Sequence, residues 1–304
     1  MSHPFFSVVI PTYNRAGFIE QTLQTVLRQT YRHYEIIVVD DCSTDHTVAL
    51  LQPYVRAGQL TLIKNERNCE RAVSRNTGMD AARGDFLTFL DSDDFMYPDN
   101  LAAAADYARA HPNMKCFHNL FEYVNAEHEV VYRPPFPSLD NPFKAIANGN
   151  FMSCIGNFIQ REIYQQYRFD PHADLVAQED WDFWLRVLAD YPVGRIEQVN
   201  SGVLQHEGRS VSTQNLESLQ AGLDYISRKL SGDPHLAAVY RPYLKRFRAN
   251  SLVHLAITSN LGALYARGLQ YLIAAARTDA SLLFSPRFIR VLQIALFRLD
   301  MTRR

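Results

Sequence analysis

The chain has 304 residues and a formal net charge of −1, and 47% of its residues are hydrophobic and 21% charged. This composition is typical of a soluble globular protein, and the length allows one large domain or two smaller ones. The sequence has no 18-residue apolar window, no basic and then apolar N-terminal segment, and no CxxC pair among its four cysteines. We therefore expect a cytoplasmic protein without a membrane span, a secretory signal, a disulfide framework or a zinc site.

The charge is distributed unevenly along the chain. Residues 241–304 contain eleven Lys or Arg and two acids, a net charge of +9, which leaves −10 for residues 1–240. Such an asymmetry predicts two parts with different partners, and the basic part suits an anionic one.

Four apolar segments in the first ninety residues each precede a segment with helical periodicity. The expected strands are FFSVVI, YEIIVVD, LTLIK and FLTFL. The helical patterns follow over residues 16–29, 43–54, 70–82 and 98–111. This alternation predicts an α/β fold with a mostly parallel central sheet and helices on both faces. In such sheets, ligands bind at the carboxyl ends of the strands.

Beyond residue 112 the pattern becomes mixed. The expected elements are antiparallel strands over 114–125 and 129–136, a strand and short helix over 153–169, an amphipathic helix over 179–191, and a strand over 194–208. Residues 216–304 have a helical pattern to their end. We therefore expect an α/β domain over residues 1–215 and a helical, basic C-terminal region over residues 216–304.

The end of the fourth expected strand carries a cluster of acids. Asp91, Asp93 and Asp94 follow closely after FLTFL, and carboxylates this close raise one another's pKa unless a positive charge neutralises them. They could cap the helix that follows Pro98. They could also bind a divalent metal ion, because carboxylate oxygens suit Mg²⁺ and Mn²⁺. These residues alone favour neither interpretation.

Five motifs occur together along the chain, in the order SVVIPTYNR, VVDDCSTDHT, SRNTG, FLDSDD and QEDWDFWLR. In order and spacing they resemble the family 2 glycosyltransferases, which are inverting, nucleotide-sugar-dependent enzymes of the GT-A fold. The resemblance covers about residues 5–215. It implies a GT-A-like nucleotide-binding domain over residues 1–215 and says nothing about the last ninety residues.

The resemblance implies which residues hold the donor. Asp41 would accept a hydrogen bond from the uracil N–H, and Tyr13, which follows Pro11 closely, would lie against the flat face of the base. Arg75 and Asn76 would face the base and the ribose. The alternative for Asp41 is that it caps the helix after it. Without the resemblance, an Arg and an Asn on a helix are more often solvent-exposed.

The same resemblance implies a metal site. Asp91 and Ser92 would approach the ribose and the metal, and Asp93 would bind the metal directly. His206 stands where many family members carry a His that completes the metal or pyrophosphate shell, and Arg209 is a candidate phosphate clamp. The expected cofactor is Mn²⁺ or Mg²⁺, which needs few protein ligands when a diphosphate supplies the other oxygens. A lone His is otherwise more often a packed or solvated side chain.

The fifth motif supplies the expected base. Asp180 corresponds to the family's general base, and Glu179 would orient Asp180 or the acceptor. The alternative is that acids at a helix start only favour the helix dipole, an interpretation that suits Asp182. We expect a structural role for Asp94. Two positions depart from the family pattern: Glu70-Arg71 replaces a common glycine, and Cys42 replaces a small residue.

We therefore expect an enzyme that moves a sugar from a UDP-sugar to a saccharide, lipid-linked or glycoconjugate acceptor, in the synthesis of a cell-surface polysaccharide or glycoconjugate. No nucleic-acid partner is expected. One alternative is a metal-dependent nucleotidyltransferase, although IPTYNRAGF lacks that class's glycine-rich phosphate loop. Another is a binding module for nucleotide sugars without catalysis, against which the acids at 93, 179 and 180 argue.

The last helical segment is amphipathic and basic. Its apolar stripe comprises Phe288, Val291, Leu292, Ala295, Leu296 and Leu299. Three fates are open for such a helix: packing on the preceding helices, a homo-oligomer contact, or a position on an anionic membrane surface. In the third case the protein would sit peripherally on the inner face of the membrane.

Overall fold

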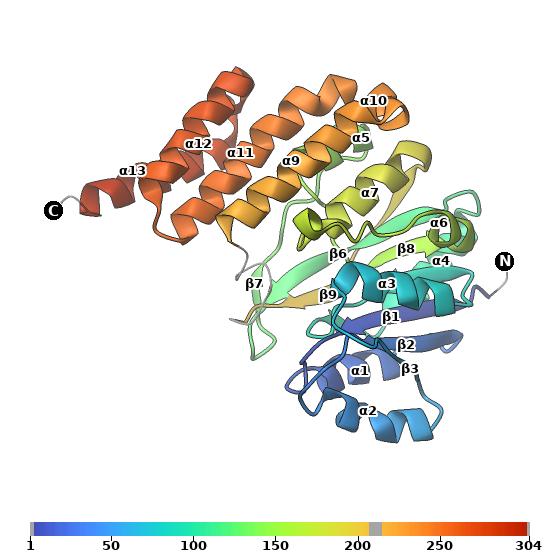
Figure 1. Cartoon of the computed structure of the whole chain (residues 1–304). Helices are drawn as coiled ribbons and strands as arrows, with labels where there is room; N and C mark the ends of the chain where they lie inside the picture. Colours follow the sequence, from blue (N-terminus) through green and yellow to red (C-terminus); the bar gives the residue numbers. More distant parts are fainter. Residues whose placement is uncertain (1–2, 207–214, 303–304) are drawn as a thin grey trace. The chain divides into compact units, whose positions relative to one another are not determined.

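The computed structural model describes residues 3–206 and 215–302 of the chain (Figure 1). Its internal contacts divide the chain into two compact units. The first comprises Met1–Pro142, Phe151–Pro171 and Glu179–Arg209, and the second comprises Phe143–Asn150, His172–Gln178 and Ser210–Arg304. Two short segments from the first part of the sequence thus belong to the second unit, so the boundary at residue 215 remains a prediction.

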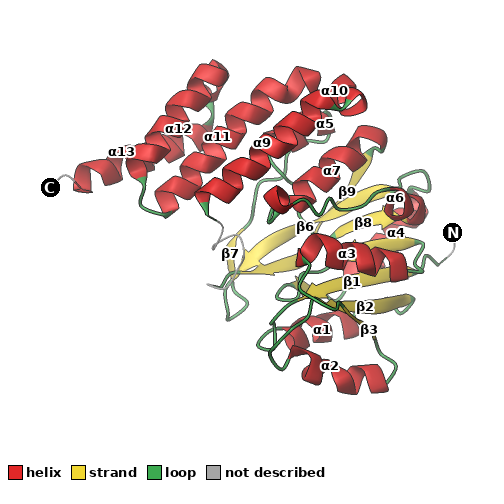
Figure 2. Cartoon of the chain, in the orientation of Figure 1, coloured by secondary structure: helices red, strands yellow, loops and turns green. Residues whose placement is uncertain are grey.

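The first unit is built on a mixed sheet (Figure 2). Its strands are β1 (Phe6–Thr12), β2 (Tyr34–Asp40), β3 (Thr61–Lys64), β4 (Phe86–Phe89), β5 (Phe95–Met96), β6 (Cys116–Val124), β7 (Val130–Tyr132), β8 (Asn157–Gln160) and β9 (Val193–Leu204). They lie in the order β3-β2-β1-β4-β8-β6-β9-β5, with β7 beside β6. The strands β3, β2, β1 and β4 are parallel, and β8 enters antiparallel between β4 and β6. The expected α/β fold with a mostly parallel sheet is confirmed.

Helices cover both faces of this sheet. They are α1 (Ile19–Leu27), α2 (Thr47–Arg56), α3 (Glu70–Ala81), α4 (Asn100–Ala110), α6 (Arg161–Gln166) and α7 (Glu179–Asp190). Alternate residues of β1 point to opposite faces, and Phe6, Val8 and Ile10 join a buried cluster with apolar residues of α1, α2 and α4. The helix α3 packs on the other face, against Val9.

A glycine allows α3 to approach β1 closely. A Cβ atom added at Gly78 would lie 2.2 Å from Cγ1 of Val9, which is closer than two carbon atoms can come without a shift. Since residues three apart lie on neighbouring positions of a helix surface, this contact also sets the position of Arg75 at the carboxyl edge of the sheet.

The second unit is helical in its described part. Its elements are α9 (Leu216–Gly232), α10 (Pro234–Tyr240), η2 (Arg241–Tyr243), α11 (Leu244–Leu261), α12 (Tyr265–Thr278), η3 (Ala280–Phe284) and α13 (Pro286–Thr302), together with η1 (Ala173–Leu175) and nearly all of α5 (Pro142–Asn148). Residues of α11, α12, η3 and α13 share an apolar core. None of the described helices is long and apolar enough to cross a membrane.

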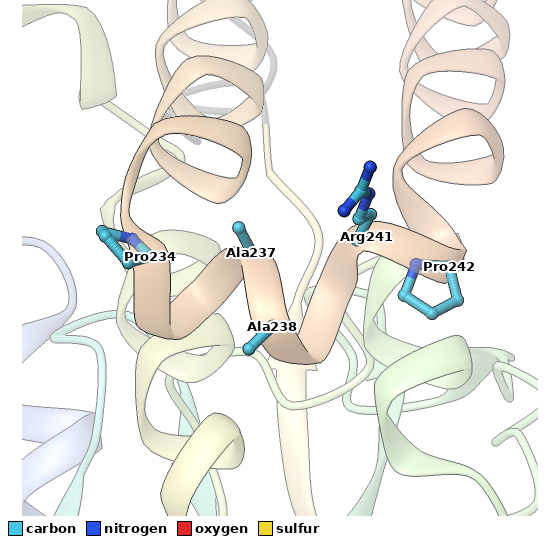
Figure 3. A pocket seen from close by; sticks show the side chains of 5 residues that line it. All are labelled: Pro234, Ala237, Ala238, Arg241 and Pro242. Carbon is cyan, nitrogen blue, oxygen red and sulfur yellow. The ribbon is translucent and has the colours of Figure 1, made fainter.

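An open depression lies beside α10 and η2 (Figure 3). Its lining consists of Pro234, Ala237, Ala238, Arg241 and Pro242. With one charged side chain among small apolar ones, it lacks the converging polar groups that fix a small ligand.

Candidate active site

The carboxyl ends of the four parallel strands meet at one edge of the sheet, as the sequence predicts. In the parallel registers, Thr12 of β1 pairs with Asp40 of β2, and Asp40 pairs with Lys64 of β3. Beyond β4, Leu90 donates its N–H to the carbonyl oxygen of Val9, which places the acids after β4 beside the loop after β1. The loops after β1, β2, β3 and β4 therefore form one polar region.

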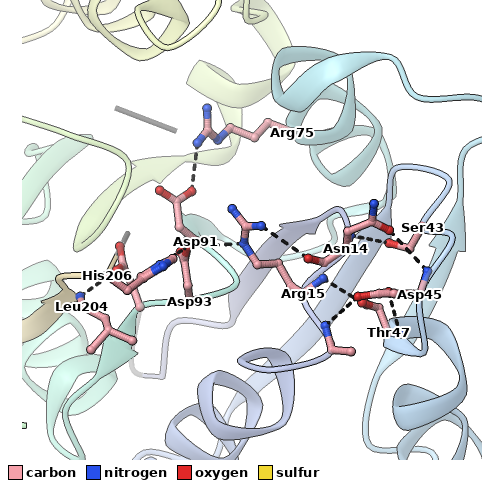
Figure 4. Close-up of polar contacts among 12 residues, drawn as sticks. Asn14, Arg15, Ser43, Asp45, Thr47, Arg75, Asp91, Asp93, Leu204 and His206 are labelled. Atoms are coloured by element: carbon pink, nitrogen blue, oxygen red, sulfur yellow. Dashed lines mark hydrogen bonds and ion pairs between the residues drawn. The ribbon is translucent and has the colours of Figure 1, made fainter. Parts of the chain in front are cut away.

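The loops after β1 and β2 are joined by hydrogen bonds (Figure 4). Asn14, at a positive φ of 50°, donates its N–H to Oγ of Ser43 at 2.9 Å and accepts from the N–H of Thr44 at 2.8 Å. The N–H of Arg15 donates to Oγ1 of Thr47 at 2.8 Å. These contacts hold the start of α2 against the loop that carries Tyr13.

Asp41 follows β2, and its carboxylate contacts the segment that leads into α3. It does not cap α2. Its carboxylate accepts from Nδ2 of Asn65 at 2.7 Å and from the N–H of Cys69 at 3.0 Å. The neighbouring Asp40 accepts from the N–H of Ser43 at 3.1 Å. Asp41 is buried, while Tyr13 is 41% exposed, as a ring available for stacking would be. The assignment of both side chains to the base stays a prediction.

Asp93 and His206 come together from distant parts of the chain. Nε2 of His206 lies 3.0 Å from Oδ2 of Asp93, and the ring of Phe18 lies against the imidazole at 4.5 Å between centroids. Nε of Arg15 lies 3.4 Å from the same carboxylate oxygen. The structure thus joins two of the predicted metal ligands and adds a cation from the loop after β1 (Figure 4).

A metal ion would find two suitable donors at this point. A carboxylate oxygen and an imidazole nitrogen are ligand types that Mn²⁺ accepts. No group of three or more His, Cys, Asp or Glu side chains forms a metal cluster among residues 3–206 and 215–302. The pair formed by Asp93 and His206 therefore fits an ion that takes its other ligands from a diphosphate and water, and not one held by protein alone.

Arg75 connects the acids after β4 with those of α7. Its side chain is 2% exposed. One terminal nitrogen lies 2.9 Å from Oδ1 of Asp91 and the other 2.6 Å from Oε1 of Glu179, while the guanidinium lies over the ring of Phe169 at 5.3 Å. A planar guanidinium can hold two carboxylates in fixed positions because its donors form a rigid fork. Arg75 thus turns toward carboxylates in this structure, and its expected contact with the base and the ribose stays a prediction.

The acids at the start of α7 differ in their surroundings. Glu179 is buried, and its Oε2 has no hydrogen-bond partner among the described residues. Asp180 is partly exposed and accepts from the N–H of Trp181 at 2.8 Å. Desolvation and then the Glu179 carboxylate raise the pKa of Asp180 to about 7, although Arg75 acts in the opposite direction. A carboxylate with a pKa near neutrality is suited to take a proton.

Other residues near the site have structural contacts. The amide of Asn76 donates to the carbonyl oxygen of Phe169 at 2.9 Å and accepts from its N–H at 2.8 Å, so it anchors the segment after α6. Asp94 accepts from the N–H of Leu204 at 3.0 Å, which agrees with the structural role expected for it. Asp182 forms an ion pair with Arg186 at 2.9 Å within α7.

The remaining predicted residues are placed as follows. Pro11 lies within β1, and Ser92 is buried between the two acids on either side of it. Arg209 lies outside the described residues. The nucleotide role of each of these three stays a prediction.

The two departures from the family pattern have a common backbone feature. Cys42 has a φ of 65° and Glu70 a φ of 67°, both in the left-handed region that favours glycine. Glycine at these positions would meet less steric resistance, because the cost of this region comes from the Cβ that the other residues carry. Glu70, the first residue of α3, therefore adopts this conformation with a side chain present.

Two residues of the site are absent from the sequence-based predictions. Arg15 contacts Asp93, and Nε of Arg71 lies 3.7 Å from Oε1 of Glu179. Arg71 precedes Arg75 by four positions, so it lies on the same face of α3. This spacing was a usable signal for Arg71, whereas the direction of Arg15 depends on the turn at Asn14.

Comparison with known proteins decides the family. The model of the family described as glycosyl transferase family 2 matches residues 7–168. The chain belongs to glycosyl transferase family 2. One relative is a putative teichuronic acid biosynthesis glycosyltransferase of Bacillus subtilis, 40% identical over 192 residues, or 61% of this chain and 72% of the relative. Another is an Escherichia coli beta-1,3-glucosyltransferase named for UDP-Glc and alpha-D-GlcNAc-diphosphoundecaprenol, 26% identical over 72% of this chain and 84% of the relative.

Solved structures support the same fold for this family 2 chain. S. aureus TarS in complex with UDP-GlcNAc has a TM-score of 0.62 at 18% identity, covering 91% of this chain and 92% of that one. The Pyrobaculum calidifontis mannosyltransferase PcManGT in complex with GDP-Man and Mn²⁺ has a TM-score of 0.64 at 17% identity, covering 98% and 85%. These likenesses establish the GT-A fold that the sequence predicts.

Proposed function

We propose that this chain is an inverting glycosyltransferase that moves a sugar from a nucleotide diphosphate sugar, a UDP-sugar in the first place, to an acceptor hydroxyl. The acceptor would be a saccharide, a lipid-linked glycan or a glycoconjugate, in the synthesis of a cell-surface polysaccharide or glycoconjugate. The observation that carries the proposal is that Arg75 donates hydrogen bonds to both Asp91 and Glu179. Arg75 thereby connects the acids around the predicted metal ligand with the acids at the start of α7. The chain's family and the names of its relatives point the same way.

Residues of the strand ends would bind the donor. The exposed ring of Tyr13 would stack on the base, and the carboxylate of Asp41 would accept from its N–H. The long side chain of Arg15 lies beside Asp93, so its guanidinium could also contact the diphosphate. The nucleotide complexes of the two solved neighbours support a donor of this class, one with UDP-GlcNAc and the other with GDP-Man.

A divalent ion, Mn²⁺ or Mg²⁺, would be held by Asp93 and His206, with Asp91 nearby. When bound, it would supply positive charge against the diphosphate leaving group. Asp91 would be restrained on its other side by Arg75, which keeps its carboxylate in place while a donor enters and leaves. The Mn²⁺ in the complex of PcManGT supports a metal of this kind.

Asp180 would act as the general base. It would take the proton of the acceptor hydroxyl while that oxygen attacks the anomeric carbon, and the nucleoside diphosphate would leave on the opposite side. Glu179 is fixed by Arg75 and keeps Oε2 without a described partner, so it could accept a hydrogen bond from the acceptor. With a pKa of about 7, the carboxyl of Asp180 is ionised in a large fraction of molecules at neutral pH.

A donor panel tests the proposal. UDP- and GDP-sugars are incubated with the protein, with Mn²⁺ or with a chelator, and the released nucleoside diphosphate is measured. The proposal predicts slow, metal-dependent release of UDP from at least one UDP-sugar, and loss of that release in Asp93→Ala. A nucleotidyltransferase would instead consume nucleoside triphosphate and release pyrophosphate. A module without catalysis would bind a nucleotide sugar, seen as a thermal shift, and release nothing.

A further inference from the structure

The helix α13 has one face inside the second unit. Phe288, Val291 and Ala295 are buried and join a cluster with residues of α11 and α12. Leu292 packs against the same cluster, so four of the six residues of the predicted apolar stripe are packed. Leu296 departs from the expectation, because its side chain is 50% exposed.

The opposite face of α13 is exposed and combines apolar with basic side chains. Arg290, Ile294 and Phe297 follow one another at the i, i+4, i+7 spacing of a single helical face. Phe297 is 66% exposed and Ile294 45%. Arg290 and Arg298 are exposed, and neither forms an ion pair with another described residue.

The segment before α13 also exposes large apolar side chains. Phe284, in the last position of η3, is 87% exposed, and Leu283 beside it is 48% exposed. Between Asp279 and Asp300 the sequence contains no acid. We use the term outer face of α13 for a set of exposed residues of this helix together with one residue of the preceding η3. They are Ile289, Arg290, Ile294, Leu296, Phe297 and Arg298 of α13, and Phe284 of η3.

We propose that the outer face of α13 docks on an anionic phospholipid surface, with Phe284 and Phe297 entering the interface between headgroups and acyl chains. An exposed aromatic ring is costly in water and favourable at that depth. Arginine extends its charged end to the headgroups while its stem covers apolar surface. The absence of acids from this segment makes the contact complementary to anionic lipid and unfavourable for a basic protein surface.

This docking is independent of the proposed reaction, since none of its residues lies in the candidate active site. Each basic residue close to an anionic membrane adds a modest attraction, and this attraction falls as salt screens the surface. One helix face of this size therefore predicts reversible, salt-sensitive binding and not permanent anchoring.

Vesicle flotation of the full chain tests the proposal. Vesicles of phosphatidylglycerol and phosphatidylcholine in equal parts are compared with vesicles of phosphatidylcholine alone, at low and at high salt. The wild type should float with the anionic vesicles at low salt only. Reversal of charge in Arg290→Glu/Arg298→Glu should weaken the partition coefficient by about tenfold or more, and Phe284→Ser/Phe297→Ser should weaken it by a similar factor.

Matched controls separate a specific face from total charge and total apolar area. Arg32→Glu/Arg56→Glu makes the same change in net charge at two exposed arginines of the first unit. Val131→Ser/Tyr132→Ser removes two apolar side chains of β7 that are each 54% exposed. Both should bind anionic vesicles as the wild type does. Melting curves of all variants show that each is folded.

Three outcomes would overturn the proposal: equal binding to neutral vesicles, equal weakening by the control variants, or no binding at all. A dimer in sedimentation velocity that Phe297→Ser dissociates, without any vesicle binding, would make the outer face of α13 an interface between two copies instead.

Discussion

At the scale of single residues, opposing effects determine the pKa of the Asp180 carboxyl. Desolvation and the carboxylate of Glu179 raise its pKa from 3.8 to about 7, and the guanidinium of Arg75 limits the rise. The unfolded chain releases this proton near its ordinary pKa, while the folded protein holds it until about pH 7. Between these two pH values the folded state binds more protons, so ionisation of Asp180 costs stability as the pH rises.

Asp180→Asn should therefore be more stable than the wild type above pH 7, because it removes the carboxylate that must ionise in the folded state. The advantage should shrink as the pH falls below 7 and should nearly vanish below the ordinary pKa of 3.8, where the carboxyl is protonated in both states. Melting temperatures measured across this range check the sign. An advantage that grows toward acid pH would show that the pKa of Asp180 is not raised.

Arg75 offers a second test at this scale, since its fork holds Asp91 and Glu179 together. Arg75→Lys keeps the charge but cannot donate to both carboxylates in the same plane. We expect kcat to fall by about tenfold to 10²-fold, because small displacements of catalytic groups are costly. The matched control is Arg186→Lys. It weakens the ion pair that Arg186 forms with Asp182 within α7.

Both Arg→Lys variants should lower the melting temperature, but only Arg75→Lys should lower kcat strongly. A role of Arg75 in stability alone would give the two variants similar activity per folded molecule. Strong loss of UDP affinity with normal kcat would instead indicate that Arg75 contacts the base and the ribose, as the family resemblance implies.

At the scale of elements, the closeness of α3 to β1 places Arg75 in the site. A methyl group at position 78 has no room beside the buried side chain of Val9. Gly78→Ala should therefore destabilise the protein by about 1–3 kcal/mol, the usual cost of overpacking a core, although alanine favours a helix more than glycine does. Denaturant unfolding of the purified variant measures this change.

Two variants complete this test. Val9→Ala makes room for the new methyl group, so Val9→Ala/Gly78→Ala should be more stable than the two separate losses predict. Gly232→Ala, at a glycine whose added Cβ would meet no atom within 4 Å, should leave stability nearly unchanged. Simple additivity in the double variant would mean that α3 does not depend on this contact.

At the scale of the whole molecule, hydrophobic periodicity and motif order predicted the α/β fold and the meeting of four strand ends. These predictions depend on local patterns and on the rule that parallel strands end at the same edge. The pairing of Asp93 with His206 was expected only through the family resemblance, because no local pattern joins residues 113 positions apart.

Other features could not be predicted from the sequence. The ion pair between Arg75 and Glu179 spans 104 positions and depends on how closely α3 lies on the sheet. The positive φ of Asn14 aims Arg15 at Asp93, and turn residues alone do not give that direction. In α13 the periodicity predicted the buried stripe, but it could not show that Leu296 and Phe297 remain exposed.

One measurement tests the central claim that this chain transfers a sugar with Asp180 as its base. The kcat of Asp180→Asn is compared with that of the wild type at saturating UDP-sugar and Mn²⁺, and UDP affinity is measured on the same preparations. The account predicts a kcat lower by about 10² or more, the scale of a lost general base, with UDP affinity almost unchanged. Normal turnover, or a loss of UDP binding that accounts for the lost activity, would contradict it.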